Sequence, residues 1–442
     1  MMTQGNAKSN AVTVAWQPLL EGDLAACAKA ILLEIAQELR DPPPAYSLPM
    51  EASLPDRQRL EEVSLAGGRT GLAVLFAYLA QAGFDGEAAE TAARFLEDGI
   101  VALSTLPMPP NLYSGFTGIA WAVAHLQETE EDEEDAGEEI DAALLDYLGQ
   151  SSWRSEYDLI NGLVGIGVYA AERLPRPSAA ACLEQVIARL EEAAERSDEG
   201  AAWFTPAQRL PGWQRKLCPA GYYNLGLAHG VPGVIGLLGI ACHAGIARER
   251  AQPLLEVAVA WLLRQKLPPD SGGSFPSWVG PGIPLEASRS AWCYGDPGVA
   301  VTLLLAARGA GREDWEAEAL EVACRAAQRP VSEAGVQDAG LCHGAAGLGH
   351  LFNRLYQATG EPRLGAAARY WLERALQMRQ PGMAVAGYPA WLPGPDDALR
   401  WEADPGLLTG AAGVALALLA AITPIEPAWD RMLLLSGPKR VA

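Results

Sequence analysis

The sequence has few basic residues. Its 442 residues include 33 Lys and Arg against 54 Asp and Glu, which gives a formal net charge of −21. Nucleic acids and anionic membranes attract clusters of Lys and Arg, so neither is expected as the main partner. Only 20% of the residues are charged whereas 50% are hydrophobic, and this composition excludes an intrinsically disordered chain. The length is sufficient to bury a large core.

Targeting and membrane-spanning patterns are also missing. The N-terminal residues lack the charged segment and apolar run of a secretory signal peptide. The longest apolar run, residues 411–422, is about half as long as a segment that spans a bilayer. The seven cysteines are odd in number and irregularly spaced, unlike a disulfide framework. We therefore expect a cytoplasmic protein with free thiols and no integral membrane segment.

What the sequence does contain is a repeat. The pattern Gly-x-x-Gly, followed by an apolar segment, occurs at Gly68/Gly71, Gly115/Gly118, Gly162/Gly165, Gly230/Gly233, Gly295/Gly298, Gly344/Gly347 and Gly410/Gly413. Successive second glycines are 47, 47, 68, 65, 49 and 66 residues apart. The short steps define a unit of about fifty residues, and the long steps add insertions of about twenty. Because glycine is abundant in this chain, the spacing and the apolar segments carry this signal.

Two kinds of helix are predicted around each glycine pair. The segments after the pairs are apolar on nearly every side, as in a buried helix. Amphipathic segments precede the pairs, for example residues 183–190 and 314–328. Such hairpins bury their inner helices only against neighbours. We predict an all-α fold for residues 1–442, a single α/α toroid of seven helical hairpins and fourteen helices with its core at about 64–422. An irregular open solenoid is the alternative.

Three insertions are expected as loops at one mouth of the toroid, where the glycine turns gather. They span residues 204–227, 268–288 and 384–405, and they are rich in Pro, Gly and Trp. Their tryptophans are Trp213, Trp278, Trp391 and Trp401. These side chains form either a peptide-binding rim or packing contacts on the toroid. The acidic stretch 128–139 is expected to be a solvated loop, with a docking role as the alternative.

Two adjacent glycine turns carry a group of possible metal ligands. Cys293 lies in the fifth turn, and Cys342 and His343 lie in the sixth. Two Cys and one His form a soft ligand set that suits Zn²⁺ with one open position. No Cys-x-x-Cys provides the fourth ligand of a structural site. An open position is typical of catalytic zinc, which lowers the pKa of a bound thiol or water.

The remaining cysteines are assigned no chemistry. Cys27, Cys182, Cys242 and Cys324 lie at apolar positions of predicted helices, and we expect them in the core. Cys218 lies in an insertion and is compatible with either a core or a chemical role.

Candidate acid–base residues lie in the neighbouring turns. His229, in the fourth turn, is either a fourth zinc ligand or a general acid/base. Asp158 precedes the third glycine turn and can orient His229, or it can cap its own turn. Arg289 and Tyr294 flank Cys293 and can stabilise a developing enolate oxygen. A surface ion pair is the alternative role for Arg289.

These motifs resemble a known family. A-H-G-V-P-G, W-C-Y-G-D-P-G and C-H-G-A-A-G, with D-L-I-N-G-L-V-G upstream, are similar to the motifs of the lanthionine synthetase C-like proteins, which include stand-alone class I lanthipeptide cyclases. The resemblance extends from about Ser64 to Ile422. It implies a zinc-dependent α/α toroid that adds cysteine thiols to dehydroalanine or dehydrobutyrine in a precursor peptide. The products are lanthionine or methyllanthionine thioether rings.

The resemblance also implies residue roles and partners. The implied zinc ligands are Cys293, Cys342 and His343. The implied catalytic residues are His229, Asp158, Arg289 and Tyr294. His229 would protonate the enolate with support from Asp158, while Arg289 and Tyr294 would assist near the enolate. The expected partner is a dehydrated lanthipeptide precursor. A separate dehydratase is expected because the chain is too short to contain one, and an export transporter is a further candidate.

Two other functions are alternatives to the cyclase. A non-catalytic protein on the same scaffold would bind zinc and a thiol such as glutathione or a peptide cysteine, but Asp158, His229 and Arg289 favour an enzyme. A glycosidase-type barrel needs two carboxylates facing one cavity. Only Asp158 and Asp296 lie near the turns, and neither explains the Cys/His set.

Overall fold

The computed structural model describes residues 15–46, 56–127, 135, 137–150, 152–394 and 398–438. Of the acidic stretch, 128–134 and 136 lie outside these residues. The described Asp135 pairs with Arg173 at 2.8 Å, so this part of the stretch is bonded to the toroid.

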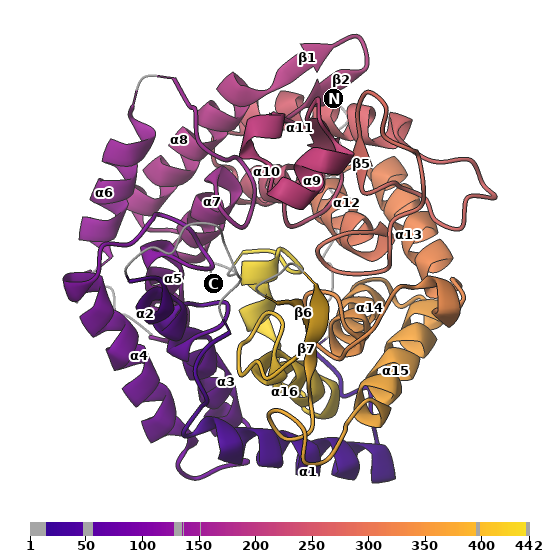
Figure 1. The fold of residues 1–442 in the computed structure, drawn as a ribbon. Coiled ribbons are helices and arrows are strands. Elements are labelled where there is room, and N and C mark those ends of the chain that lie inside the picture. Colours follow the sequence, from indigo (N-terminus) through magenta and orange to yellow (C-terminus); the bar gives the residue numbers. More distant parts are fainter. Residues whose placement is uncertain are drawn as a thin grey trace, which may run out of the picture.

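The inner helices form a closed ring (Figure 1). Each packs against the next, and α16 packs against α3, which excludes an open solenoid. In the described chain they are α3 (Arg69–Gln81), α5 (Phe116–Leu126), α7 (Leu163–Glu172), α10 (Val231–Ala244), α12 (Asp296–Ala310), α14 (Ala345–Thr359) and α16 (Ala411–Ile422). The first glycine of a predicted pair is the N-cap of each. Closure of the ring buries the apolar sides of all these helices. Each Val, Leu or Ile side chain that is buried in this way stabilises the folded state by about 1.5–3 kcal/mol.

Seven amphipathic helices surround the ring within the described residues. They are α1 (Gly22–Leu39), α4 (Ala88–Thr105), α6 (Glu138–Leu148), α8 (Pro177–Ala193), α11 (Arg248–Arg264), α13 (Glu313–Ala327) and α15 (Pro362–Gln377). On α8 the predicted face is buried, comprising Leu183, Val186, Ile187 and Leu190. The fold is therefore the predicted α/α toroid of fourteen helices.

The hairpins start with the inner helix, whereas the sequence repeat predicts units that start with the outer helix. Each of α3, α7, α10, α12 and α14 packs against the outer helix that follows it, and α16 packs against α1. The short connection between α14 and α15 explains why an inner helix pairs with the outer helix that follows it. Only Gly360 and Glu361 connect these two helices. Gly360 is left-handed at φ 70° and ends α14, so α15 folds straight back. Because α1 supplies the outer partner of the last inner helix, the two ends of the chain close the ring.

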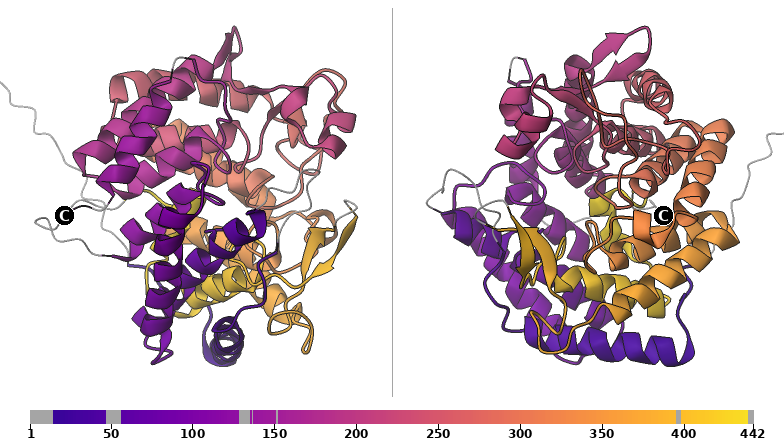
Figure 2. Two further views of the ribbon diagram at one scale, coloured as in Figure 1. Left: turned by 60° about the vertical axis from the view of Figure 1, so that its left-hand side comes forward. Right: turned by 45° about the vertical axis from the view of Figure 1, so that its right-hand side comes forward.

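The insertions contain short strands (β3 to β7) rather than loops alone, and they lie on the same face of the ring (Figure 2), while β1 and β2 directly precede the first insertion. The strands are β1 (Glu195–Ser197), β2 (Gly200–Ala202), β3 (Phe204–Thr205), β4 (Tyr222–Asn224), β5 (Trp278–Val279), β6 (Ala390–Pro393) and β7 (Leu399–Glu402). The antiparallel pairs β1–β2 and β6–β7 are hairpins. The order β3-β4-β5 joins the first insertion to the second. Short helical elements complete the fold: α2 (Arg57–Val63), α9 (Gly212–Leu217), η1 (Ala207–Arg209), η2 (Val331–Glu333) and η3 (Ala428–Leu433).

Some tryptophan side chains of the insertions pack against other rings, and some remain exposed to solvent. Trp278 stacks on Tyr222 with ring centroids 5.5 Å apart, as expected for packing. Trp391 and Trp401 face each other across β6–β7 at 4.9 Å. Trp213 and Trp401 remain 48% and 45% exposed, so a peptide-binding rim stays a prediction for these two.

The C-terminal segment lies inside the ring, where the yellow end of the ribbon occupies the centre of Figure 1. Trp429 and residues 432–435 are buried there. The Tyr113 hydroxyl donates to the Met432 carbonyl at 2.8 Å, and Trp292 Nε1 donates to the Leu433 carbonyl at 2.9 Å. Because Trp292 directly precedes Cys293, this segment supports the turn that carries the first predicted ligand.

Cysteine burial follows the sequence expectation at three of four helical positions. Cys182, Cys242 and Cys324 are buried, but Cys27 is exposed, so its expected core position was wrong. On α1 the buried face includes Ala28, and Cys27 lies beside this face on the solvent side. Cys218 is buried in a small apolar cluster of the first insertion.

No described helix has both the length and the continuous apolarity required to cross a bilayer.

Candidate metal centre and acid–base site

Backbone hydrogen bonds link successive glycine turns and bring the predicted residues together. The residue two positions before the first glycine of a turn donates its N–H to the corresponding carbonyl of a neighbouring turn. Ala228 donates to Cys293 at 3.3 Å, Cys293 to Cys342 at 3.3 Å, and Cys342 to Leu408 at 2.8 Å. Leu408 continues the series to Ala66 at 2.9 Å. Cys293 and Cys342 therefore occupy equivalent, directly bonded positions, although 49 residues separate them in the sequence.

Gly295 shapes the turn that holds Cys293. It has φ 117°, in the region that favours glycine, and a Cβ there would lie 1.8 Å from the Arg289 carbonyl oxygen. In the sixth turn, Gly344 has extended φ, but a Cβ would approach the Gly340 nitrogen to 2.2 Å. Close backbone approach thus requires both glycines, and only the first also needs a positive φ.

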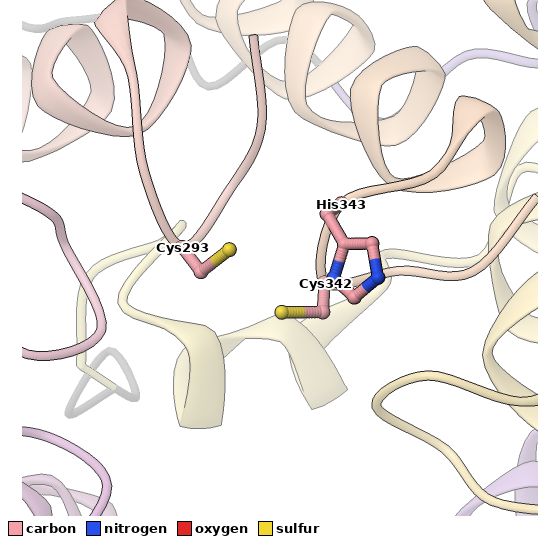
Figure 3. Close-up of side chains that lie close together, drawn as sticks. All are labelled: Cys293, Cys342 and His343. Carbon is pink, nitrogen blue, oxygen red and sulfur yellow. The ribbon is translucent and has the colours of Figure 1, made fainter. Parts of the chain in front are cut away.

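The three predicted ligands form one cluster (Figure 3). Ligand atoms of Cys293, Cys342 and His343 all lie within 4.8 Å of one another. In Figure 3 the cysteines extend from separate loops toward a common space, and the imidazole lies beside Cys342. Tetrahedral zinc, with sulfur at about 2.3 Å and nitrogen at about 2.0 Å, spaces its ligand atoms by about 3.5–3.8 Å. Small side-chain rotations therefore suffice to bind a metal ion.

His343 provides an independent test of whether a metal fits. Its Nδ1 is buried and has no hydrogen-bond partner among the described residues. Its Nε2 lies 3.7 Å from the Asp338 carboxylate. A buried imidazole nitrogen without a partner is costly in an apolar protein interior, and metal coordination would satisfy it. The donor set and this atom both fit a soft divalent cation.

The cluster favours negative charge on sulfur. The pKa of the Cys293 thiol is well below its ordinary value, because Cys342 donates a hydrogen bond to its sulfur. His343 and Arg289 lower this pKa further, and together these groups outweigh burial, which raises it. Arg289 Nη2 lies 3.2 Å from Cys293 Sγ. The pKa of Cys342 is raised, because it donates to the charged Cys293 and is itself buried. Arg289 is therefore a direct partner of the sulfur, and the alternative of a surface ion pair is wrong.

His229 and Asp158 form a second pair at this site. His229 Nδ1 lies 2.6 Å from Asp158 Oδ2. Asp158 also accepts the Asn161 N–H at 2.7 Å, so it caps its turn and orients His229 at once. Burial lowers the pKa of His229, but the adjacent Asp158 carboxylate, with Cys293 and Glu156, raises it more, and the net pKa is raised. The imidazole is 37% exposed and is not part of the three-residue metal group found among the described residues.

Tyr294 is a neighbour of both groups. Its ring centroid is 6.4 Å from that of His229, and it directly follows Cys293. Burial raises the pKa of Tyr294 to about 12, so the phenol is protonated at neutral pH. Asn224 Nδ2 donates to the Tyr294 hydroxyl at 2.9 Å. Since the oxygen accepts from Asn224, its own proton is available to a group in the site.

Sequence reasoning missed Asn224 and Asp338. Both lie six positions before the first glycine of a turn, as do Arg289 and Asp404. Asn224 Oδ1 and Asp338 Oδ1 accept the N–H two residues ahead, at 2.8 and 3.1 Å. Alignment of the seven turns on their glycines would have shown polar side chains at this position in the last five turns, beginning with Glu156. Asp296 takes a different role, since its carboxylate accepts N–H groups of the second insertion at 2.6 and 3.0 Å.

Comparison with known proteins agrees with this geometry. The family model described as "Lanthionine synthetase C-like protein" matches residues 60–434. Nisin biosynthesis protein NisC of Lactococcus lactis subsp. lactis is 24% identical over 309 residues, covering 65% of this chain and 72% of the relative. Glutathione S-transferase LANCL1 of Danio rerio is 31% identical over 141 residues, or 31% of this chain and 32% of the relative. A solved structure of nisin cyclase has the same fold, with a TM-score of 0.68 at 20% identity, over 85% of this chain and 92% of that chain.

Proposed function

Because the chain belongs to the lanthionine synthetase C-like family, we propose that it is a zinc-dependent lanthipeptide cyclase. The reaction is addition of a cysteine thiol of a precursor peptide to a dehydroalanine or dehydrobutyrine of the same peptide, giving lanthionine or methyllanthionine. The observation that carries the proposal is the group formed by Cys293, Cys342 and His343, whose ligand atoms lie within 4.8 Å. The similarity to a nisin biosynthesis protein supports the substrate class.

Cys293, Cys342 and His343 would hold the zinc ion. Two sulfurs and one nitrogen leave one coordination position for a peptide sulfur. When bound, zinc would lower the pKa of a peptide thiol and supply its thiolate at neutral pH. Arg289, 3.2 Å from Cys293 Sγ, would balance the negative charge gathered on the sulfur atoms.

His229 would deliver the proton that completes the addition. Attack of a thiolate on the β-carbon leaves an enolate, whose α-carbon must then be protonated. Asp158 accepts from His229 Nδ1–H at 2.6 Å, which leaves Nε2 to carry the transferable proton. The raised pKa of His229, due to this carboxylate, keeps the imidazolium populated at higher pH than for a free histidine.

Tyr294 would stabilise the enolate oxygen. Its protonated hydroxyl accepts from Asn224 at 2.9 Å and can donate to a developing negative charge. A donor held by a buried amide requires little reorganisation during the reaction, because Asn224 is fully buried.

The implied partners follow from this chemistry. The substrate is a precursor peptide whose Ser and Thr have been dehydrated. A separate dehydratase would supply it, and an export transporter would take the product. A cytoplasmic location fits both free thiols and zinc ligation.

The decisive assay uses the purified protein and a dehydrated precursor peptide. Cyclisation consumes one thiol per ring without changing the peptide mass, so alkylation by a thiol reagent should decrease while the unmodified mass stays constant. Cys293→Ala should leave the thiols reactive. Thiols that stay fully reactive with the zinc-loaded wild-type protein and its cognate peptide would contradict the proposal.

A second candidate function is non-catalytic binding of zinc and a thiol such as glutathione. The local similarity to a glutathione S-transferase, which covers 31% of this chain, supports glutathione as the thiol. Under the binding function there is no turnover to lose, and His229→Ala would keep its zinc. Under the cyclase function, the same variant would lose turnover while keeping zinc.

A further inference from the structure

Asp338 is a buried carboxylate that faces the metal centre. It is 3% exposed. Oδ1 accepts the Gly340 N–H at 3.1 Å within its own turn, and Oδ2 accepts the Trp391 N–H at 2.9 Å from β6. Oδ2 also lies 3.7 Å from His343 Nε2. One carboxylate thus contacts its own turn, a strand of the third insertion and an implied metal ligand.

The following repeat shows that this arrangement is built into the turn. Asp404 has the same place in the seventh turn as Asp338 in the sixth, six residues before the first glycine. Its Oδ1 accepts the Gly406 N–H at 2.7 Å, as Asp338 does from Gly340. Its Oδ2 accepts the hydroxyl of Thr409, which occupies the position of His343. In both turns one oxygen caps the loop and the other faces the side chain just before the glycine.

The two nitrogens of His343 have contrasting surroundings. A neutral imidazole carries one N–H and one lone pair, and its surroundings decide which nitrogen carries the proton. Nε2 faces the carboxylate, whereas Nδ1 is buried without a hydrogen-bond partner among the described residues. A carboxylate beside Nε2 favours the proton there and leaves the lone pair on Nδ1.

We propose that Asp338 is a positioning residue of the metal centre. It holds His343 as the Nε2–H tautomer with Nδ1 directed to the ion, and its bond to Trp391 N–H connects the ligand to the β6–β7 hairpin. The proposal rests on the proposed function, because it requires that Cys293, Cys342 and His343 bind zinc. Carboxylates that orient ligating histidines typically change metal affinity by about 10–100-fold.

A purely structural role would act through the bonds to Gly340 N–H and Trp391 N–H and would not pass through His343. Asp338→Asn retains an oxygen to accept the Gly340 N–H, but it places an amide NH₂ at the Oδ2 position. It therefore removes both the negative charge beside His343 and the acceptor for the Trp391 N–H, and the His343→Ala background separates the two effects. Asp404→Asn is the matched control, since it changes the equivalent carboxylate of a turn that has Thr409 instead of a ligand. Asp338→Ser is a second variant, because a serine hydroxyl can also accept a nearby backbone N–H.

The experiment measures zinc affinity by chelator competition. Wild type and Asp404→Asn should bind one zinc with equal affinity, whereas Asp338→Asn should bind about 10–100-fold more weakly. If Asp338→Asn does not fold, Asp338→Ser is expected to show the same loss. In a His343→Ala background, Asp338→Asn should cause no further loss, because its effect passes through the imidazole. The visible spectrum of the cobalt-substituted protein should change in Asp338→Asn and stay unchanged in Asp404→Asn.

Two results would overturn the proposal. One is a folded Asp338→Asn variant that binds zinc as tightly as wild type. The other is that Asp338→Asn weakens zinc binding by the same factor in the His343→Ala background as in wild type. In both cases wild type still binds zinc, so the proposed function survives. Absence of zinc from wild type would contradict the proposed function itself and the positioning role with it.

Discussion

His229 Nδ1 lies 2.6 Å from Asp158 Oδ2, although 71 positions separate the two residues in the sequence. The contact exists because the third and fourth glycine turns are neighbours in the ring. Leu159 and Ala228, each next to one of the pair, share a backbone hydrogen bond of 3.2 Å. The paired carboxylate raises the pKa of His229, although burial opposes it.

This pair predicts a pH effect in Asp158→Asn. In wild type the raised pKa of His229 keeps its proton to higher pH, so activity that needs the protonated form falls only above that raised pKa. Without the carboxylate the pKa falls, and the basic limb of the kcat/KM profile should move to lower pH. The pH–rate profile of both proteins checks this. An unchanged basic limb in the variant would mean that another group is the acid.

Replacement of His229 itself should lower the activity more than Asp158→Asn does. His229→Ala is expected to lose about 10²–10⁴-fold in kcat, the usual contribution of a positioned acid or base, and to retain its zinc. His243→Ala is the control, since His243 is exposed at the end of α10 and should leave cyclisation unchanged. Single-turnover ring formation and metal analysis measure the two effects. Loss of zinc in His229→Ala would reassign this residue to the metal centre.

Tyr294→Phe tests the hydroxyl held by Asn224. The variant removes the donor to the enolate oxygen and leaves the ring in place, so kcat/KM should fall by about 10²-fold without loss of zinc. Tyr223→Phe is the matched control, because Tyr223 lies on the same strand as Asn224 but donates to the surface Glu195 at 2.7 Å. Equal rates for the two variants would remove Tyr294 from the mechanism.

The glycine turns were visible in the sequence because their constraint is local. Every predicted pair begins an inner helix, and the apolar segments behind them led directly to the toroid. The convergence of Cys293, Cys342 and His343 also followed from equivalent repeat positions. By contrast, Cys27 was misplaced because the buried face of α1 is set by its packing on α16, at the other end of the chain.

Contacts that cross between repeats were harder to anticipate. The bond between Asp338 and Trp391 N–H depends on the path of an insertion whose strand pairing has no clear sequence pattern. The place of η3 inside the ring was likewise not evident from the sequence. Its burial depends on Tyr113 and Trp292, which come from distant turns and donate to its carbonyl groups.

Gly295→Ala should destabilise the protein strongly. A Cβ would lie 1.8 Å from the Arg289 carbonyl oxygen, and φ 117° is unfavourable for alanine. The close approach and the unfavourable φ should together lower the free energy of unfolding by about 4 kcal/mol or more. Gly282→Ala is the control, since φ is +75° there and nothing lies within 4 Å, so only about 1–2 kcal/mol of backbone strain is expected. Urea unfolding compares them, and equal losses would show that close approach is not the cause.

Asp430 anchors the C-terminal segment within the ring. It is fully buried, pairs with Arg354 at 2.8 Å and lies 2.9 Å from His350 Nε2. Asp430→Ala leaves a buried guanidinium without this partner, so unfolding should become easier by about 3–5 kcal/mol. Asp314→Ala, which breaks the exposed pair with Arg312, should cost at most about 1 kcal/mol.

The effect of Asp430 should also depend on pH. Burial raises its pKa, but Arg354, His350 and Ser436 together lower it more, so the folded pKa lies below the ordinary value. Its stabilisation is therefore complete above the ordinary pKa and is lost as pH falls through the folded one. The difference between wild type and Asp430→Ala in urea unfolding should shrink in strong acid. A difference that is constant with pH would contradict an ionic anchor.

X-ray absorption at the zinc edge, with and without an added thiol, tests the metal centre most directly. The account predicts two sulfur and one nitrogen ligand plus one light atom in the free protein, and three sulfur ligands after a thiol binds. Zinc absent from the purified protein, or held by four donors that a thiol does not change, would contradict it.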